Sequence, residues 1–242
     1  MTEKQLPRYL IDIRRLSKIY NEGKPSEVRA VDDISLQVRY GEFLCILGQS
    51  GSGKSTLMNI LGCLDIPTYG RYLLNGTPVN EMKPSALSAI RNREIGFIFQ
   101  GFNLISGLTA IENVELPLIY RGVGRSQRRK LAVDALTEVG LEKRLNHRPT
   151  EMSGGQQQRV AIARAIAAKP PIIMADEPTG NLDSHAGKDV MLKLQQLNRE
   201  GATIILITHD NHLATMAKRI VTIQDGKVIS DRPCDGRGEF SA

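Results

Sequence analysis

Gly48-Gln49-Ser50-Gly51-Ser52-Gly53-Lys54-Ser55 decides the fold of this 242-residue chain. The stretch follows the pattern of a phosphate-binding loop, which is glycine, four residues, glycine, lysine and then serine or threonine. The apolar run 43–47 leads into it as a buried strand would, and the helix-forming residues 56–61 follow it. A strand, a glycine-rich turn and a helix N-terminus direct several backbone N–H groups at one point. We therefore predict a polyphosphate site at the start of a helix.

Each residue type in this loop has a chemical role. Gly51 and Gly53 permit positive φ angles and a close approach of the backbone to a ligand. Lys54 places a charge near the β- and γ-phosphates of a nucleotide, and the hydroxyl of Ser55 can bind Mg²⁺. A glycine- and serine-rich turn without a ligand is the alternative, and both flanks argue against it. The predicted nucleotide-binding residues are Gly48, Gln49, Ser50, Gly51, Ser52, Gly53, Lys54, Ser55 and Thr56.

Composition is compatible with one nucleotide-binding unit. Hydrophobic residues make up 41% of the chain and charged residues 24%, which is ordinary for a globular protein. No apolar run approaches the roughly 20 residues that span a bilayer, and no signal-peptide segment is recognisable, so we expect a cytoplasmic location. Three cysteines show neither metal-ligand spacing nor the density of a disulfide framework. The net charge of +6 fits several kinds of partner and does not decide function.

The chain divides into three regions. Residues from about 8 to 95 read as strands and tight turns around the phosphate loop, with a hairpin at Asn75-Gly76. Residues from about 103 to 168 have helical spacing, and Gly140 is a candidate helix stop. The uninterrupted apolar runs 172–175 and 203–207, joined by an amphipathic helix over 186–199, predict parallel strands covered on both faces. Asp225-Gly226 predicts a final hairpin, and residues 232–242 are expected to be a disordered tail.

An acid pair follows the first of these apolar strands. Asp176 and Glu177 come directly after the run 172–175, at the C-terminal end of a strand, where α/β sheets bind ligands. One acid at this point can hold Mg²⁺, and the adjacent one can polarise an attacking water. We assign the metal-side role to Asp176 and the general-base role to Glu177.

A second glycine-rich segment supplies the family resemblance. The segment Met152-Ser153-Gly154-Gly155-Gln156-Gln157-Gln158-Arg159 resembles the signature sequence of ABC-transporter ATPases, which usually begins with leucine. A serine hydroxyl and glycine amides at the head of a helix form a second candidate anion site. The resemblance implies that Ser153, Gly154, Gly155 and Gln156 contact ATP held by the other subunit of a head-to-tail homodimer. An N-cap serine followed by flexible glycines is the simpler alternative.

Other positions match the family one by one. Gln100, which ends the strand 95–99, resembles the glutamine that senses Mg²⁺, so the implied metal residues are Ser55, Gln100 and Asp176. Asp183 resembles the loop residue that reaches the opposing subunit. His209 resembles the switch histidine at the γ-phosphate and joins Glu177 and Lys54 as the implied catalytic residues. Tyr20 resembles the aromatic residue that stacks on adenine, although many strands end in tyrosine for packing.

The resemblance covers about residues 10–230. In residues 57–65, 99–104, 112–118 and 176–183 it is closest to the ATPases of macrolide exporters and lipoprotein-releasing complexes. It implies an α/β fold with a P-loop NTPase core, an N-terminal antiparallel β-subdomain and an inserted α-helical subdomain at about 103–168, within a domain at 8–231. Such an ATPase subunit would use ATP and Mg²⁺ to drive export or mechanical work. Gln49 departs from the family, where proline or alanine is common, but only backbone geometry is needed there.

The resemblance also implies partners. The membrane partner would be a separate permease-type protein with a large extracytoplasmic part, with or without a periplasmic adaptor. The ATPase would lie on the cytoplasmic face of the inner membrane, and no nucleic acid would be bound. A soluble ATPase of the same superfamily, acting in DNA repair, chromosome organisation or translation, is the main alternative. A regulatory module that binds ATP without turnover is the other.

Overall fold

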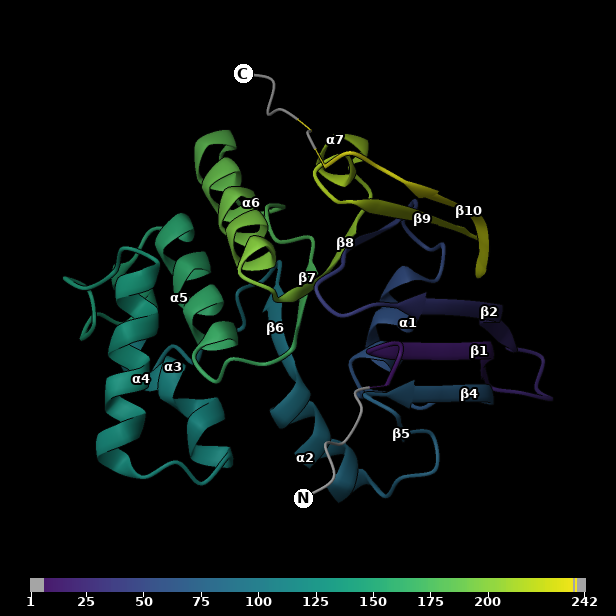
Figure 1. Ribbon diagram of the computed structural model, residues 1–242, viewed down its shortest axis with the longest axis horizontal. Helices are drawn as coiled ribbons and strands as arrows, with labels where there is room; N and C mark the ends of the chain where they lie inside the picture. The colour runs from purple at the N-terminus through teal and green to yellow at the C-terminus, as the bar shows by residue number, and fades with distance from the viewer. Residues whose placement is uncertain (1–6, 237, 239–242) are drawn as a thin grey trace. The chain divides into compact units, whose positions relative to one another are not determined.

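The computed structural model describes residues 7–236 and 238, which fall into two compact units (Figure 1). Unit 1 comprises the described residues of 7–91 and 206–238, and unit 2 comprises residues 92–205. The boundary runs through one strand, β8, whose first half belongs to unit 2 and whose second half belongs to unit 1.

An antiparallel sheet forms the N-terminal part of unit 1. Its strand order is β2-β1-β4-β5, with β1 at Ile11–Tyr20, β2 at Val28–Val38, β4 at Tyr69–Leu74 and β5 at Thr77–Pro78. Strand β1 has irregular register on both sides, and Arg15 lies in the left-handed region at φ 50°. The hairpin between β4 and β5 has Asn75 at φ 50° and Gly76 at φ 73°, as the sequence predicted. This sheet confirms the expected antiparallel β-subdomain.

The rest of unit 1 carries the phosphate loop. Strand β3 (Phe43–Leu47) is buried throughout and pairs in parallel with β9 (Arg219–Gln224), which pairs antiparallel with β10 (Lys227–Pro233). The end of β3 also contacts the end of β8 (Thr203–Thr208), since the Gly48 N–H donates to the Thr208 carbonyl at 3.3 Å. The helices of unit 1 are α1 (Lys54–Leu61), α7 (Asn211–Ala214) and most of α2 (Pro84–Glu94). The phosphate loop therefore lies between the C-terminal end of β3 and the N-terminus of α1.

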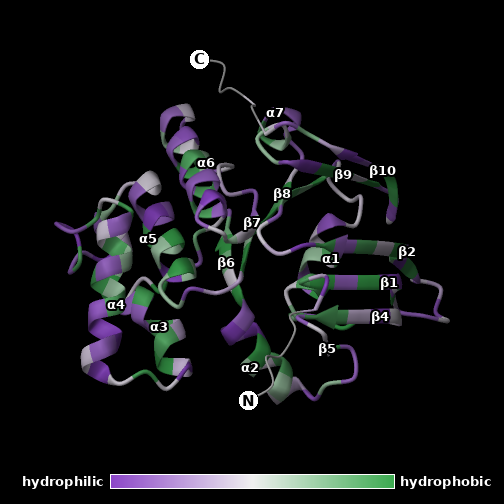
Figure 2. Ribbon diagram, viewed as in Figure 1, coloured by the Kyte–Doolittle hydropathy of each residue, from purple (hydrophilic) through white to green (hydrophobic). Residues whose placement is uncertain are grey.

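Unit 2 combines parallel strands with a helical layer. Strand β6 (Ile95–Phe99) pairs in parallel with β7 (Ile172–Asp176), and β8 follows on the other side of β7. Helices α3 (Ala110–Tyr120), α4 (Arg125–Glu138) and α5 (Gly154–Ile166) contact one another, and α6 (Ser184–Arg199) contacts α5. A short 3₁₀ turn, η1, spans Pro149–Glu151. Figure 2 shows hydrophobic residues along β6 and β8, whereas α4 is largely hydrophilic.

Two expectations about the chain need correction. The region 8–95 was expected to hold strands and turns, but α2 occupies Pro84–Glu94, where Leu87 is the helix's one buried residue and leaves almost no apolar periodicity to detect. A tail was expected from residue 232, but Arg232 and Pro233 still pair with β9, and the Cys234 N–H donates to the Lys218 carbonyl at 2.8 Å. Residues 237 and 239–242 of that predicted tail lie outside the described part of the chain.

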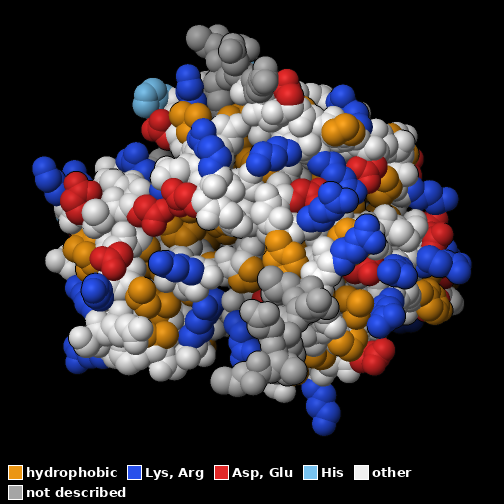
Figure 3. Space-filling model, in the orientation of Figure 1, with side chains coloured by type: hydrophobic (Ala, Val, Ile, Leu, Met, Phe, Trp, Pro, Cys, Tyr) orange, Lys and Arg blue, Asp and Glu red, His pale blue; other side chains and the backbone are white. Residues whose placement is uncertain are grey.

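Surface and helix lengths add two observations. On the face seen in Figure 3, Lys and Arg side chains lie among Asp and Glu side chains. Within residues 7–236 and 238, no helix has both the length and the apolar character needed to cross a membrane.

Candidate functional site

The phosphate loop in unit 1 joins β3 to α1 as the sequence predicted. Lys54 is 7% exposed, and its Nζ donates to the carbonyl of Gln49 at 2.6 Å, so the ammonium group lies back along the loop. Helix α1 begins with Gly53 as its N-cap, without a side-chain cap and without an acidic residue in its first turn. Helix α1 therefore has no side-chain cap at its N-terminus, which suits an anion at this helix end.

The glycines of the loop meet different steric demands. Gly53 has φ +99°, and a Cβ there would clash with the Ala30 carbonyl oxygen, so this position requires glycine. Gly51 has φ +81° with no atom within 4 Å of the position that a Cβ would occupy. Ser52 Oγ is buried and has no hydrogen-bond partner in the described structure. A left-handed backbone, an uncapped helix start and an unsatisfied hydroxyl are features that fit a bound polyphosphate.

His209 lines the same hollow as the start of the loop. The hollow has a volume of about 410 Å³, and its lining includes residues 48–52, His209, Asn211 and residues 222–225. His209 follows β8 directly, and the hydrogen bond from Gly48 to Thr208 holds the ends of β3 and β8 together. The structure therefore brings His209 and the phosphate loop together within unit 1.

Tyr20 lies elsewhere in unit 1, in a cluster that the sequence did not reveal. Its hydroxyl donates to Asp65 Oδ2 at 3.1 Å, and Lys18 Nζ lies 5.0 Å from its ring centroid. Lys18 Nζ also donates to Asp65 Oδ1 at 2.7 Å. Burial raises the pKa of Asp65, but hydrogen bonds from Lys18 and from the Ile66 N–H outweigh it and hold that pKa below its ordinary value. The Tyr20 side chain, 37% exposed as a residue, is thus oriented by an ionised carboxylate.

The acid pair and Gln100 meet at one sheet edge in unit 2. Phe99 and Asp176 are register partners at the ends of the parallel strands β6 and β7, so Gln100 and Glu177 both follow that edge. The Asn181 side chain donates to the Gln100 carbonyl at 2.9 Å and accepts from Gln100 Nε2 at 3.5 Å. The backbone of Glu177 lies in the left-handed region at φ 42°. For a residue with a side chain this conformation costs about 1–2 kcal/mol, and such strain concentrates at functional sites.

The signature segment and Asp183 form a second hollow in unit 2. Ser153 is the N-cap of α5 in a capping box: Ser153 Oγ accepts from the Gln156 N–H at 3.3 Å, and Gln156 Oε1 accepts from the Ser153 N–H at 3.1 Å. Asp183 is the N-cap of α6 and accepts from the Ala186 N–H at 2.8 Å. The hollow of about 390 Å³ is lined by Ser153, Gly154, Gly155, Arg159, Asn181, Leu182, Asp183, His185, Ala186 and Asp189.

The predicted residues thus fall into two groups. Unit 1 holds the phosphate loop, His209 and Tyr20, whereas unit 2 holds Gln100, the acid pair, the signature residues and Asp183. The described residues contain no group of three or more His, Cys, Asp and Glu side chains that could hold a metal ion. A Mg²⁺ ion bound by one carboxylate, a hydroxyl, an amide and substrate phosphates requires no such cluster. Ser55 in unit 1 and Gln100 and Asp176 in unit 2 carry side chains of these three kinds.

Sequence reasoning missed the residues that orient these groups. Asp65 lies 45 residues from Tyr20 in sequence, and Asn181 lies 81 residues from Gln100. No local pattern encodes such contacts, since they depend on how distant strand ends meet. Arg159, which ends the signature-like segment, was assigned no role, although its position four residues after Gly155 on α5 places it on the same helix face and in the same hollow.

Comparison with known proteins gives consistent matches. The family model described as "ABC transporter" matches residues 31–180, which is more than half of the chain. The macrolide export ATP-binding/permease protein MacB of Hyphomonas neptunium is 51% identical over 222 residues, which cover 92% of this chain and 34% of that protein. The chain therefore spans about a third of the length of this relative. The uncharacterized ABC transporter ATP-binding protein YvrO of Bacillus subtilis is 49% identical over 232 residues, which cover 96% of this chain and 99% of that protein.

Solved structures match as well. The dimeric structure of MJ0796, a bacterial ABC transporter cassette, has a TM-score of 0.85 and 45% identity and covers 95% of this chain and 100% of that one. A dimeric post-hydrolysis state of the same cassette, bound to ADP and Pi, has a TM-score of 0.84 and 44% identity, with the same coverage of both chains.

Proposed function

This chain belongs to the ABC transporter family as an ATP-binding cassette, and from that premise we propose that it hydrolyses ATP to drive a membrane protein. The observation that carries the proposal is the phosphate loop, where the buried Lys54, the left-handed Gly53 and the uncapped start of α1 converge. The signature residues at the N-terminus of α5 support a dimer, because they resemble the family segment that contacts ATP bound to the other subunit.

In the proposed reaction, each group has one task. The phosphate loop binds the β- and γ-phosphates, Lys54 offsets their charge, and Tyr20 stacks on adenine. Glu177 accepts the proton of the attacking water, while His209 contacts the γ-phosphate and orients it. Ser55, Gln100 and Asp176 would hold Mg²⁺, which supplies charge neutralisation at the transferred phosphoryl group. Ser153 and Asp183 would face the nucleotide of the opposing subunit, so hydrolysis would end the contact between two subunits.

The proposed assembly is a homodimer that forms around ATP and docks on a permease-type membrane protein. The dimeric cassette structures and the MacB relatives support a dimer and a permease partner. We place the cassette on the cytoplasmic face of the inner membrane, and we place the large extracytoplasmic part and any periplasmic adaptor on the partner. Export and the transmission of mechanical work both fit this assembly.

The non-transport alternative has no support from the matches, because the relatives and cassette structures described above are all transporter components. A regulatory module without turnover is disfavoured by the presence of Glu177 and His209, which such a module would not need. We therefore propose a transport ATPase, and its membrane partner can be identified by co-purification from detergent-solubilised membranes.

Lys54→Ala tests the phosphate site. We expect loss of both ATP binding and turnover, because Lys54 contributes charge to the phosphates before any reaction begins. Titration with a fluorescent ATP analogue measures the binding. Lys83→Ala, at an exposed position beside α2 in the same unit, is the matched control and should bind normally. Unchanged ATP affinity in Lys54→Ala would show that this lysine stabilises the transition state and does not contribute to ATP binding.

Asp65→Ala tests the orientation of Tyr20. We expect the dissociation constant for ATP to rise about fivefold, which corresponds to roughly 1 kcal/mol for the lost hydrogen bond of the Tyr20 hydroxyl. Turnover at saturating ATP should stay near wild type. Inorganic tripolyphosphate has no base, so it should bind the wild-type chain and Asp65→Ala with equal affinity in a competition assay. An equal loss for tripolyphosphate would contradict the role given to Asp65, and Asp33→Ala is the exposed control.

A further inference from the structure

Arg164 of helix α5 is a partly buried cation without an ion pair in the described part of the chain. Its Nη1 donates to the Asn103 carbonyl at 2.5 Å and its Nη2 donates to the Phe102 carbonyl at 2.8 Å. Among residues 7–236 and 238 it forms no salt bridge, and burial lowers the pKa of its guanidinium. A partly buried charge is stabilised by hydrogen bonds to its donors, and these two carbonyl groups accept them.

The two acceptor residues have strained backbones. Phe102 lies at φ 59° and Asn103 at φ 50°, although neither is glycine. Both lie in the segment that continues from Gln100, and the Asn103 N–H donates to the Gly101 carbonyl at 2.6 Å. Consecutive left-handed residues persist only where surrounding contacts hold them. The guanidinium fork, which presents two donors in a fixed plane, is suited to hold two successive carbonyl groups in this arrangement.

A second side chain of α5 holds the loop that follows Glu177. Gln158 is fully buried, and its Nε2 donates to the Pro178 carbonyl at 2.6 Å. The Asn181 side chain then joins that loop to the Gln100 carbonyl. Helix α5, which begins at the Ser153 cap, is therefore bonded to both loops at the sheet edge, and the two loops are bonded to each other.

We propose that Arg164 is a positioning residue for the ATPase reaction. From helix α5, which is capped by Ser153, it holds Phe102 and Asn103 in their left-handed conformation and thereby orients the side chain of Gln100. The role rests on the proposed function, since Gln100 is assigned to Mg²⁺ there. It links the signature helix to the metal-side loop through contacts that lie wholly within unit 2. Displacement of α5 would shift the Phe102 and Asn103 carbonyls, and the side chain of Gln100 would shift with them.

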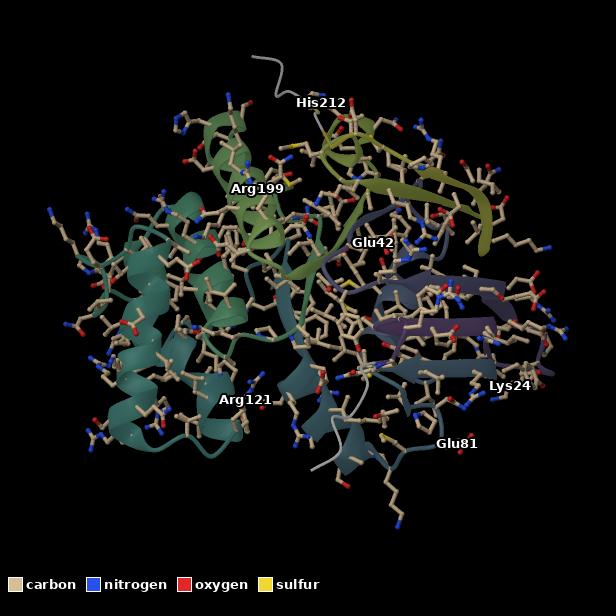
Figure 4. The ribbon with its side chains drawn as sticks, viewed as in Figure 1. Lys24, Glu42, Glu81, Arg121, Arg199 and His212 are labelled. Carbon is tan, nitrogen blue, oxygen red and sulfur yellow. The ribbon has the colours of Figure 1, made fainter. Side chains whose placement is uncertain are left out.

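Hydrogen exchange of the nucleotide-free chain tests the structural half. Arg164→Met keeps an unbranched apolar stem but removes the guanidinium group and with it both donors. We expect amides in the peptide 100–104 to exchange about tenfold faster, the factor set by loss of one hydrogen bond to a charged group. Arg121→Met is the matched control, because Arg121 also donates to backbone carbonyls, at Asn92, Arg93 and Ala168. Arg121 belongs to unit 2 and is labelled in Figure 4. Arg121→Met should speed amide exchange near residues 92–93 and 168 and leave exchange in the peptide 100–104 unchanged.

Mg²⁺ titration tests the functional half. In Arg164→Met we expect the half-saturating Mg²⁺ concentration for ATP turnover to rise roughly tenfold, as for other residues that orient a metal ligand. Binding of ATP without Mg²⁺ should stay unchanged, since the phosphate loop belongs to unit 1. Arg164→Lys retains the charge and one donor and should recover part of both effects. In the double variant with Gln100→Ala, the loss should not exceed that of Gln100→Ala alone, because both changes act through one side chain.

Three results would overturn the proposal. Unchanged exchange at 100–104 would show that Arg164 does not hold the segment. Faster exchange with an unchanged Mg²⁺ requirement would show that the segment does not aim Gln100. Additive losses in the double variant would show that Arg164 acts by another route. If Arg164→Met does not fold, Arg164→Lys serves for the same three comparisons. A wild-type chain without ATPase activity would refute the proposed function, whereas the exchange result would still show whether Arg164 holds the segment 101–103.

Discussion

Glu177→Gln should bind ATP and fail to hydrolyse it. Glutamine keeps the shape of the side chain but cannot accept the proton of the attacking water, so we expect turnover to fall by about 10²-fold or more. The left-handed backbone of Glu177 is held by local contacts, such as the hydrogen bond from the Gly180 N–H to its carbonyl at 3.0 Å, and glutamine leaves these unchanged. ATP should then accumulate a dimer, visible by size-exclusion chromatography as twice the 26.7-kDa chain.

The control for this variant is Glu81→Gln, an exposed carboxylate of unit 1 that Figure 4 labels. It makes the same change of charge at a position that belongs to no predicted site and should hydrolyse ATP normally. Turnover near the wild-type rate in Glu177→Gln would refute the general-base role. Loss of turnover together with loss of ATP binding would show instead that the strained turn had collapsed.

Local sequence patterns predicted the elements that carry their own signals. The phosphate loop lies between β3 and α1, and the hairpin turns at Asn75-Gly76 and Asp225-Gly226 have the positive φ angles that two-residue hairpins require. Gly140 follows the end of α4 at φ 72°, as a helix stop should. In each case the conformation is determined by residues within one turn of the chain.

Contacts between distant segments could not be predicted in this way. Asp65 and Arg164 both lie in stretches with an ordinary local pattern, and their importance appears only when a partner far away in sequence is brought to them. The strain at Glu177 is also invisible in the sequence, because glutamate gives no local signal for a left-handed backbone. The family resemblance supplied residue identities, and the three-dimensional contacts supplied their orienting partners.

Ser153→Arg should abolish turnover while leaving ATP binding intact. The change removes the hydroxyl that accepts from the Gln156 N–H, at a cost of about 1 kcal/mol, and places a long cation in the hollow beside Asp183. The phosphate loop is part of the other unit, so ATP should bind a monomer normally. Thr109→Arg is the matched control, since Thr109 caps α3 in the same kind of capping box but belongs to no predicted site. It should lose a similar amount of stability and keep its turnover.

Mixing the two inactive variants decides whether the active site is shared between subunits. A head-to-tail heterodimer of Ser153→Arg with Lys54→Ala combines an intact phosphate loop from the first chain with an intact signature from the second. Its other site carries both defects. If half of all dimers are heterodimers and each has one working site, about a quarter of wild-type activity should return. Coupling between sites would lower that value, but any activity above the sum of the separate variants requires a composite site. A Ser153→Arg chain that hydrolyses ATP as a strict monomer would contradict the dimer mechanism, because no second signature would then be needed.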